Sequence, residues 1–468
     1  MPVYFDSPME NDLFNNSRIA NFYNVKTGQM PSNMLLFSPR AGFRLYMNDN
    51  HTTLLRGGAG IFTGRIPFVW MSNCFSNTGM GLAGTQISGV DEFTEAIAKG
   101  FKPSFDPHSQ WVDPTAAVPT AEVDVVSDDF KYPQVLRLNA ALEQELPGGV
   151  KMTLEGMFSR TFNNILYRNL NYTWEEDSKL AIGTNDNRYQ FQKVDDQFTN
   201  VILLDNTNKG YSANMTAKFE KNFESGLNLM AAYTWGKSTG VNDGTSSQAY
   251  SSWKYNYTYN GDADPIATNT AFDQRHRIIA SVSYRKEYAK HFASEVSLFY
   301  QGYSGGHYSL VYYNDMNGDG RYGNDLLYIP TDAELAAMNF TNDEGRSDMT
   351  KWIHSDDYLE GRQGTYAQRN GMDKPFEHHF DLHFAQDFFI NVAGQRNTLQ
   401  LNFDIMNVGN LLNHEWGLYH GPSNGFSQSP VKYDGRSDTY QWRGPADMIT
   451  VSDISSRWHA QVGVKYKF

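Results

Sequence analysis

The strongest constraint on this fold is a recurring pattern in which apolar and polar side chains alternate residue by residue. The last segment of the chain, RWHAQVGVKYKF, shows it most clearly. Its apolar and aromatic side chains share one face: Trp458, Ala460, Val462, Val464, Tyr466 and Phe468. Its polar or small side chains share the other: His459, Gln461, Gly463, Lys465 and Lys467. A period of two predicts a β-strand with one apolar side.

The polar faces of these segments carry more Asn, Gln, Lys, Glu and Asp than a sandwich core accepts, as in LRLNAALEQEL, SANMTAKFE and TLQLNFDIM. Such faces suit a lumen filled by water or by a plug. The sequence has no run of about 18 apolar residues, the length of a transmembrane helix, whereas a barrel strand needs only about ten residues. A soluble sandwich or propeller has the same period, so the alternation alone leaves that alternative open.

The connections between the segments favour a membrane barrel. Very short turns (NDNH, PGG, ESG, KEYAK and NVAGQR) alternate with long polar connections at residues 66–131, 239–272 and 304–375. Tight turns on one rim and long loops on the other are typical of an antiparallel outer-membrane β-barrel. The chain is therefore predicted to be all-β.

The pattern predicts about eleven strands. They are expected near residues 35–48, 52–65, 131–146, 150–168, 211–223, 227–239, 273–287, 291–304, 376–390, 397–411 and 455–468. The first and last both run towards the short-turn rim. An odd number of strands with this direction cannot close on itself, and open edges are not tolerated in lipid. We expect residues 1–468 to be part of a larger barrel.

Composition excludes several classes of protein. Cys74 is the only cysteine, so an intramolecular disulfide framework and a cysteine-based metal site are excluded. The formal net charge of −13 argues against nucleic-acid binding. The N-terminal sequence MPVYFDSPMENDLFNNSR lacks the basic start and apolar core of a secretory signal.

Several longer motifs carry a family resemblance. They are LRGGAGIFTGRIPFVWMSN (55–73), LLDNTNKGYSANMTAKFEKNF (203–223), FDQRHRIIASVSY (272–284), NDMNGDGRYGNDLLYIP (314–330) and DIMNVGNLLN (404–413), together with the terminal strand. With these motifs the chain resembles the C-terminal barrel part of SusC/Oar-like TonB-dependent transporters of the Bacteroidetes. The resemblance covers nearly the whole chain.

The resemblance implies the C-terminal half of a 22-stranded barrel in the outer membrane of a Gram-negative bacterium. It implies active import of a large nutrient, such as a glycan or a peptide, powered by the TonB complex. It also implies contacts with outer-membrane lipids and with a SusD-like surface lipoprotein. The signal peptide, TonB box and plug domain of the family are not found in this sequence, so we expect them on a longer protein.

The terminal aromatic residues fit the same resemblance. Phe468, with Tyr466 two residues before it, resembles the signal that the outer-membrane assembly machinery reads. The alternative is a strand that merely ends on an aromatic residue.

The segment DMNGDGRYGND contains a candidate calcium loop. Asp315, Asn317 and Asp319 occupy positions one, three and five, and Gly320 occupies position six. Alternate oxygens at this spacing converge on a hard cation. Asp325 falls at position eleven instead of the bidentate position twelve, which weakens the case. The alternative is a hydrogen-bonded Asx turn.

Three potential ligands alternate along FEHHFDLHF: His379, Asp381 and His383. Side chains of this kind bind transition metals. Residues two apart on a strand lie roughly 7 Å apart, which is awkward for chelation. We therefore favour the alternative, which is a polar face turned towards the lumen.

Two further features lie in the long connections. Thr331 and Glu334 have capping-box spacing, which predicts a short helix at 331–338. A possible function of this helix is contact with a partner protein that forms a lid. Phe68, Trp70 and Phe75 either line a ligand site or seal their loop onto its neighbours. No catalytic arrangement stands out in the sequence, so an enzyme is not predicted.

The sequence is also compatible with two functions other than active import. One is a non-transporting scaffold barrel that holds other surface proteins by its loops. The other is a soluble β-rich binding protein, which would need no detergent.

Overall fold

In a computed structural model of the protein, the described residues are 7–80, 94, 121–179, 185–422, 427–444 and 449–468. Eleven strands among them form one antiparallel path. In order they are β1 (Arg40–Tyr46), β2 (Thr53–Thr63), β4 (Gln134–Leu146), β5 (Val150–Asn169), β9 (Gly210–Asn222), β10 (Leu227–Gly240), β12 (His276–Tyr288), β13 (Phe292–Tyr303), β18 (Glu377–Val392), β19 (Gln395–Met406) and β24 (His459–Lys467). Each of the eleven expected ranges overlaps one of these strands.

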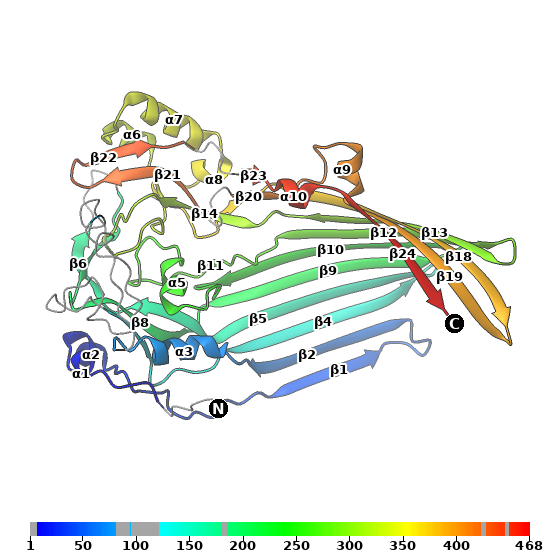
Figure 1. The fold of residues 1–468 in the computed structure, drawn as a ribbon, viewed down its shortest axis with the longest axis horizontal. Helices are drawn as coiled ribbons and strands as arrows, with labels where there is room; N and C mark the ends of the chain where they lie inside the picture. The colour runs from blue at the N-terminus through cyan, green and yellow to red at the C-terminus, as the bar shows by residue number, and fades with distance from the viewer. Residues whose placement is uncertain (1–6, 81–93, 95–120, 180–184, 423–426, 445–448) are drawn as a thin grey trace.

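The connections at the two ends of the sheet differ in length (Figure 1). At one end, tight turns join β1 to β2, β4 to β5, β9 to β10, β12 to β13 and β18 to β19. The turn after β4 contains Gly148 and Gly149 at φ +81° and +73°, a left-handed conformation that glycine adopts without steric cost. β24 runs antiparallel to β19 and ends at this same rim. The expected separation of short turns and long loops is confirmed.

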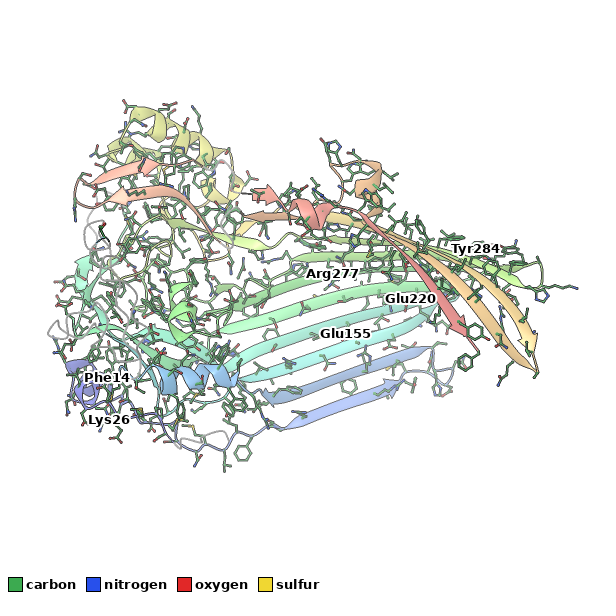
Figure 2. All side chains as sticks on the ribbon, viewed as in Figure 1. Phe14, Lys26, Glu155, Glu220, Arg277 and Tyr284 are labelled. Atoms are coloured by element: carbon green, nitrogen blue, oxygen red, sulfur yellow. The ribbon has the colours of Figure 1, made fainter. Side chains whose placement is uncertain are left out.

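One face of the sheet is apolar and exposed. Phe384, Phe403 and Val462 pair side by side across β18, β19 and β24, and their side chains are 39%, 40% and 73% exposed. Tyr284, labelled in Figure 2, lies on the same face in β12 and is 42% exposed. A band of exposed apolar side chains suits contact with lipid.

The opposite face carries polar side chains joined by ion pairs. Arg56 in β2 contacts Glu143 in β4 at 2.8 Å and Glu155 in β5 at 3.0 Å; Glu155 is labelled in Figure 2. Arg285 in β12 contacts Asp387 in β18 at 2.8 Å. The polar side chains thus connect strands across the inner face, as the alternation predicted.

Both ends of the strand path are open. Within the described residues, β1 pairs only with β2 and β24 pairs only with β19. All seven residues of β1 are exposed. Backbone groups at such an edge have no partner in lipid, where each unpaired group is costly.

The long connections are more structured than their polar sequences indicated, because they contain short apolar runs such as YSLVYY. Most of their elements gather beyond the rim opposite the tight turns, whereas α9 (Val408–Leu412) and α10 (Asp453–Ser456) lie above the strands (Figure 1). The elements of the connections are α3 (Phe68–Ser76), β3 (Ala121–Val126), β6 (Tyr172–Lys179), β7 (Tyr189–Lys193), β8 (Phe198–Thr207), α5 (Ala249–Lys254), β11 (Thr268–Asn269), β14 (His307–Tyr312), β15 (Tyr328–Ile329), α6 (Asp332–Ala337), α7 (Asp343–His354), α8 (Asp357–Glu360), β16 (Thr365–Tyr366), β17 (Met372–Asp373), α9, β20 (His420–Pro422), β21 (Ser427–Asp434), β22 (Thr439–Trp442), β23 (Ile449–Val451) and α10.

Among the described residues, these connections and the two N-terminal helices bury three apolar clusters. The largest joins β14, β15, α6, α7, β21 and β22. The second packs α1 (Asp12–Asn15) and α2 (Arg18–Tyr23) against β3 and β8. The third packs α3 and α5 against β8 and the end of β5. In the described part of the chain, no helix has the length and apolar character needed to cross a bilayer.

A new charge should destabilise the protein much more on the apolar face than on the polar face. Leu401 lies on the apolar face of β19 and is 40% exposed, so Leu401→Lys should destabilise the fold by about 2–4 kcal/mol if it lies near the bilayer midplane. Asn402→Lys, one residue away on the polar face, is the matched control and should cost far less. The measurement is the free energy of unfolding in lipid vesicles. Equal losses in the two variants would contradict the assignment of faces.

Candidate functional site

The candidate site lies in the loops beyond the long-loop rim, where the acidic segment 315–325 meets two other connections. The Phe191 N–H donates to the Asn317 carbonyl at 2.8 Å, which joins the segment to β7. The Leu326 N–H donates to the Thr258 carbonyl at 2.9 Å, which joins it to the connection between β10 and β12. Segments far apart in the sequence therefore converge here.

Asp315 and two glycines shape the start of the segment. The Asp315 carboxylate accepts hydrogen bonds from the Gly318 N–H at 2.7 Å and the Gly320 N–H at 2.9 Å. Gly318 and Gly320 have φ values of +77° and +84°. A Cβ on Gly320 would also lie 2.2 Å from the Tyr172 hydroxyl. Only glycine fits at position 320, as the motif predicted.

The next two polar side chains form Asx turns. The Asn317 side-chain oxygen accepts from the Asp319 N–H at 3.0 Å. The Asp319 carboxylate accepts from the Arg321 N–H at 3.1 Å. The segment therefore contains the hydrogen-bonded Asx turns that are the alternative to a calcium loop. A carboxylate has about four acceptor positions, so these turns leave further positions open.

Two buried arginines neutralise part of the segment's charge, and neither was predicted from the sequence. The Arg321 guanidinium donates to the Asp319 carboxylate at 2.9 Å and to the Trp253 carbonyl at 3.0 Å. Arg188 is fully buried and lies 3.8 Å from one Asp325 oxygen. Its main partner is Asp186, at 2.9 Å. Arg321 directly follows the acidic motif, whereas nothing in the local sequence marks Arg188.

Burial and mutual repulsion make the carboxylates weak acids. Burial, followed by the neighbouring Asp319 charge, raises the pKa of Asp315 to about 6. The same two causes raise the pKa of Asp325 well above its usual value. Burial also raises the pKa of Asp262, whose carboxylate accepts from the Trp253 indole N–H at 2.9 Å. The site holds more negative charge than its arginines balance.

The structure places all four predicted calcium-binding residues, Asp315, Asn317, Asp319 and Asp325, in one compact loop. Their oxygens accept hydrogen bonds from backbone amides and from Arg321. Among the described residues, no group of three or more His, Cys, Asp or Glu side chains is arranged to hold a metal ion. Calcium binding therefore stays a prediction.

The alternating triplet in β18 has three separate sets of partners. His379 stacks on Tyr419 with ring centroids 4.0 Å apart. Asp381 accepts from the Asn407 N–H at 2.8 Å, and His383 hydrogen-bonds to Asp404. Side chains committed to different neighbours favour the polar-face interpretation over a transition-metal site.

The predicted short helix is present as α6. Thr331 caps it, accepting from the Glu334 N–H at 3.3 Å, and the Glu334 carboxylate accepts from the Thr331 N–H at 2.8 Å. The same carboxylate accepts from the Tyr328 hydroxyl and the Asn185 N–H. The capping box thus ties α6 to other loops. Contact with a lid partner remains a prediction.

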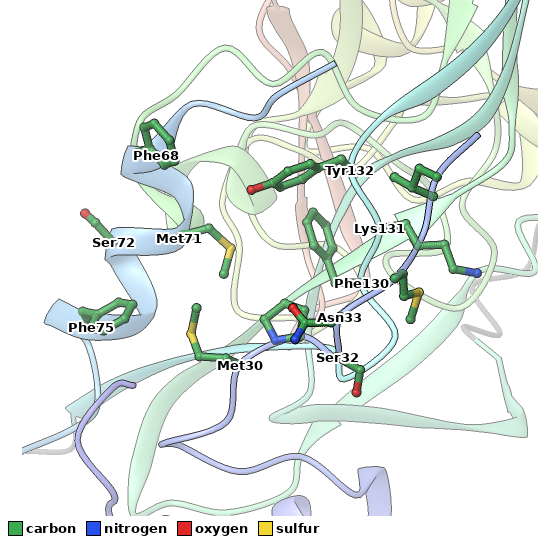
Figure 3. Close-up of a pocket in the computed structure, with 13 residues that line it drawn as sticks. Met30, Ser32, Asn33, Phe68, Met71, Ser72, Phe75, Phe130, Lys131 and Tyr132 are labelled. Carbon is green, nitrogen blue, oxygen red and sulfur yellow. The ribbon is translucent and has the colours of Figure 1, made fainter. Parts of the chain in front are cut away.

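The aromatic residues of the first long loop have two different kinds of surroundings. Phe68 and Phe75 on α3 line a cavity of about 510 Å³. Figure 3 shows Met71 between them on α3, with Phe130 and Tyr132 across the cavity. This cavity is largely apolar.

Trp70, on the same helix, contacts neighbouring segments. Its indole N–H donates to the Ser246 carbonyl at 2.8 Å, and its ring packs edge-on against Tyr167. Trp70 therefore seals α3 onto the connection between β10 and β12.

A second cavity, of about 450 Å³, is lined mainly by residues of polar type and was not predicted. Arg369, only 4% exposed, lies in its wall and donates to the Val241 carbonyl at 2.6 Å and to the Asn256 side chain at 2.8 Å. Hydroxyl and amide side chains make up most of the remaining wall: Asn242, Thr245, Ser246, Ser251, Ser252, Asn256 and Asn370. Most of the surface that these residues expose to the cavity is nevertheless apolar. Its residues come from distant segments, so no single motif marks it.

A buried histidine fastens the start of β14 to the rim. The His307 imidazole contacts Asp373 at 2.5 Å and Asp273 at 3.2 Å, and Asp273 also contacts Arg275 at 2.9 Å. Burial opposes the charged imidazole, but the hydrogen bonds to the two carboxylates outweigh burial and raise the pKa of His307 to about 9. Despite burial, the His307 hydrogen bond and the Ser238 N–H lower the pKa of Asp273.

A family model described as "Outer membrane beta barrel domain" matches residues 7–430. Among the curated proteins compared, none matches the chain.

Solved structures of larger proteins are similar to the chain. The outer membrane transporter YddB from Escherichia coli is 11% identical, with a TM-score of 0.42. The match covers 92% of this chain and 39% of the YddB chain. The ferric enterobactin receptor PfeA from Pseudomonas aeruginosa is 8% identical, with a TM-score of 0.35, covering 80% and 34%. The FrpB iron transporter from Neisseria meningitidis is 9% identical, with a TM-score of 0.28, covering 79% and 39%. The chain spans less than two fifths of each.

The His307 contacts predict a loss of stability at alkaline pH. The folded pKa of about 9 lies above the ordinary 6.5, so the stabilisation is complete below pH 6.5 and is lost as the pH rises through 9. Hydrogen exchange of β14 should therefore accelerate between about pH 7 and about pH 10, after correction for the intrinsic rate. His307→Gln should abolish this extra acceleration, and the exposed His414→Gln should keep it. An unchanged pH dependence in His307→Gln would contradict the assignment.

Proposed function

This chain belongs to the outer membrane beta barrel domain family and is located in the outer membrane, and from that premise we propose that it forms part of the wall of an active importer. The importer would be TonB-dependent and of the SusC/Oar-like type. Its cargo would be a large nutrient such as a glycan or a peptide. The residues quoted for the family resemblance support this proposal.

The observation that carries the proposal is the open, two-faced sheet. Eleven strands with an apolar outer face and an ion-paired inner face make a barrel wall that ends in two unpaired edges, β1 and β24. Because lipid penalises such edges, we propose that further strands complete a barrel of about 22 strands. A plug supplied with those strands would gate the lumen.

The loop assembly supports a role in capturing the cargo. The cavity at α3 and the cavity around Arg369 lie among the long loops. Concave sites of several hundred Å³ with a few polar groups are typical of ligand binding. A SusD-like surface lipoprotein would cover these loops, and the TonB complex would supply the energy from the inner membrane.

The end of β24 supports a role in assembly. Phe468 is 89% exposed, and Tyr466 stacks on it with ring centroids 5.8 Å apart. The Tyr466 hydroxyl also donates to Asn397 at 2.6 Å. An exposed aromatic pair at a free strand edge would be accessible to the outer-membrane assembly machinery.

The first experiment is an intact mass, with N-terminal peptide mapping, of the protein extracted in detergent from outer membranes. We expect a species roughly twice this mass or larger, with peptides upstream of Met1. We then expect uptake of its cargo, screened with labelled oligosaccharides and peptides, to stop when an uncoupler collapses the proton gradient. A deletion strain is the control for uptake by other routes.

Two outcomes would contradict the importer. A species of about the mass of this chain would mean that a separate subunit completes the barrel. A full-length protein whose deletion changes no uptake, but releases other proteins from the cell surface, would favour the scaffold function.

A further inference from the structure

An arginine on the apolar face of the sheet has no acidic partner. Arg160 in β5 lies opposite Leu136 in β4 and opposite Tyr211 in β9, and residues opposite each other in an antiparallel pair share a face. Arg160 is exposed, and no carboxylate among the described residues forms an ion pair with it. A charge on a surface that faces lipid must reach polar groups outside the hydrocarbon.

A second cation lies across β9 from Arg160. Lys237 in β10 is opposite Ala213 in β9, and Ala213 is opposite Phe158 in β5. Lys237 therefore shares the apolar face with Arg160, and it too has no ion pair within the described part of the chain. β9 lies between β5 and β10 (Figure 1), which are therefore about 10 Å apart. Two long side chains can bridge that distance through one phosphate.

An open hollow of about 610 Å³ lies beside Arg160. Its wall consists of Phe158, Arg160, Asn208, Lys209, Gly210 and Tyr211. The rings of Phe158 and Tyr211 stack with centroids 6.3 Å apart. Lys209 adds positive charge at the edge of the hollow, where it donates to the Pro265 carbonyl at 2.7 Å and lies 3.5 Å from Asp264. The hollow thus combines cationic and aromatic groups on the apolar face.

The position of Arg160 along the strands places it at the level of lipid headgroups. On the apolar side of β9, Tyr211 and Lys221 are separated only by uncharged side chains: Ala213, Met215, Ala217 and Phe219. The distance from Tyr211 to Lys221 is roughly 33 Å along the strand and about 25 Å in height at the usual tilt. That is the height of the apolar band in outer-membrane barrels. Arg160, beside Tyr211, therefore lies at the long-loop edge of the band, and Lys221 lies at the short-turn edge.

We propose that Arg160 and Lys237 bind a phosphate group of a glycolipid in the outer leaflet. The long loops of outer-membrane barrels lie outside the cell, so this edge of the band meets the outer leaflet. A guanidinium group pairs with phosphate through two parallel hydrogen bonds, and the ammonium group adds a second charge. The acyl chains would pack along the apolar face below, over Ala213 and the exposed Met215. This inference rests on the location in the outer membrane and not on the proposed transport function.

The test is a titration of the whole protein, extracted in detergent and freed of bound lipid, with lipid A. Native mass spectrometry counts the lipid A molecules on each protein. Arg160→Gln should need about fivefold more lipid A to fill the site, which is the contribution of one cation near an anionic membrane surface. The double variant Arg160→Gln/Lys237→Gln should hold one lipid A molecule fewer than the wild type. Lys221→Gln, on the same face at the opposite edge of the band, is the matched control and should bind as the wild type does.

Two further comparisons use the wild type alone and decide the question if the double variant fails to fold. Lipid A without its phosphates should leave the site empty, and inorganic phosphate at equal concentration should not displace lipid A. Equal binding of lipid A with and without phosphates would overturn the proposal, and displacement by inorganic phosphate would overturn the assignment to a lipid. Equal lipid A counts in the double variant and in Lys221→Gln would also overturn the proposal.

Discussion

The constraint on which this structure depends is that lipid offers no hydrogen bonds to a peptide backbone. Eleven strands satisfy it by pairing in sequence order along one sheet. The same pairing decides on which face of the sheet each side chain lies. A shift of the register by one residue would turn Phe403 inward and Asp404 towards lipid. Ion pairs such as Arg285–Asp387 then hold the polar face in that register.

Outside the bilayer, water can form hydrogen bonds with exposed backbone groups, so strand pairing is no longer required. There the connections must bury apolar surface to become ordered, and they do so in three clusters. Between the clusters, buried charges such as Arg188 and Arg321 bind carbonyls and carboxylates from several segments. The cavities therefore have walls set by the packing of the whole loop assembly.

The features predicted from the sequence are those with a local signature. Alternation located the strands, Gly148 and Gly149 marked a turn, and the Thr331–Glu334 spacing located α6. The pairing of Arg188 with Asp325 and the cavity around Arg369 were not predicted. Their partners are distant in sequence, and no local pattern records which loop will pack on which. The apolar runs inside the loops were a signal, but period-two alternation does not show that β14 pairs with β21.

The pairing of β14 with β21 has a consequence for the order of folding. β14 follows β13, whereas β21 lies between β19 and β24, and the two strands run parallel. The largest apolar cluster needs both of them. Its completion therefore depends on contacts between segments far apart in the chain, and such non-local contacts form slowly because closing the intervening chain costs entropy. The largest apolar cluster is thus expected to form late in folding, and damage to the β19–β24 connection, which contains β21, would disrupt it.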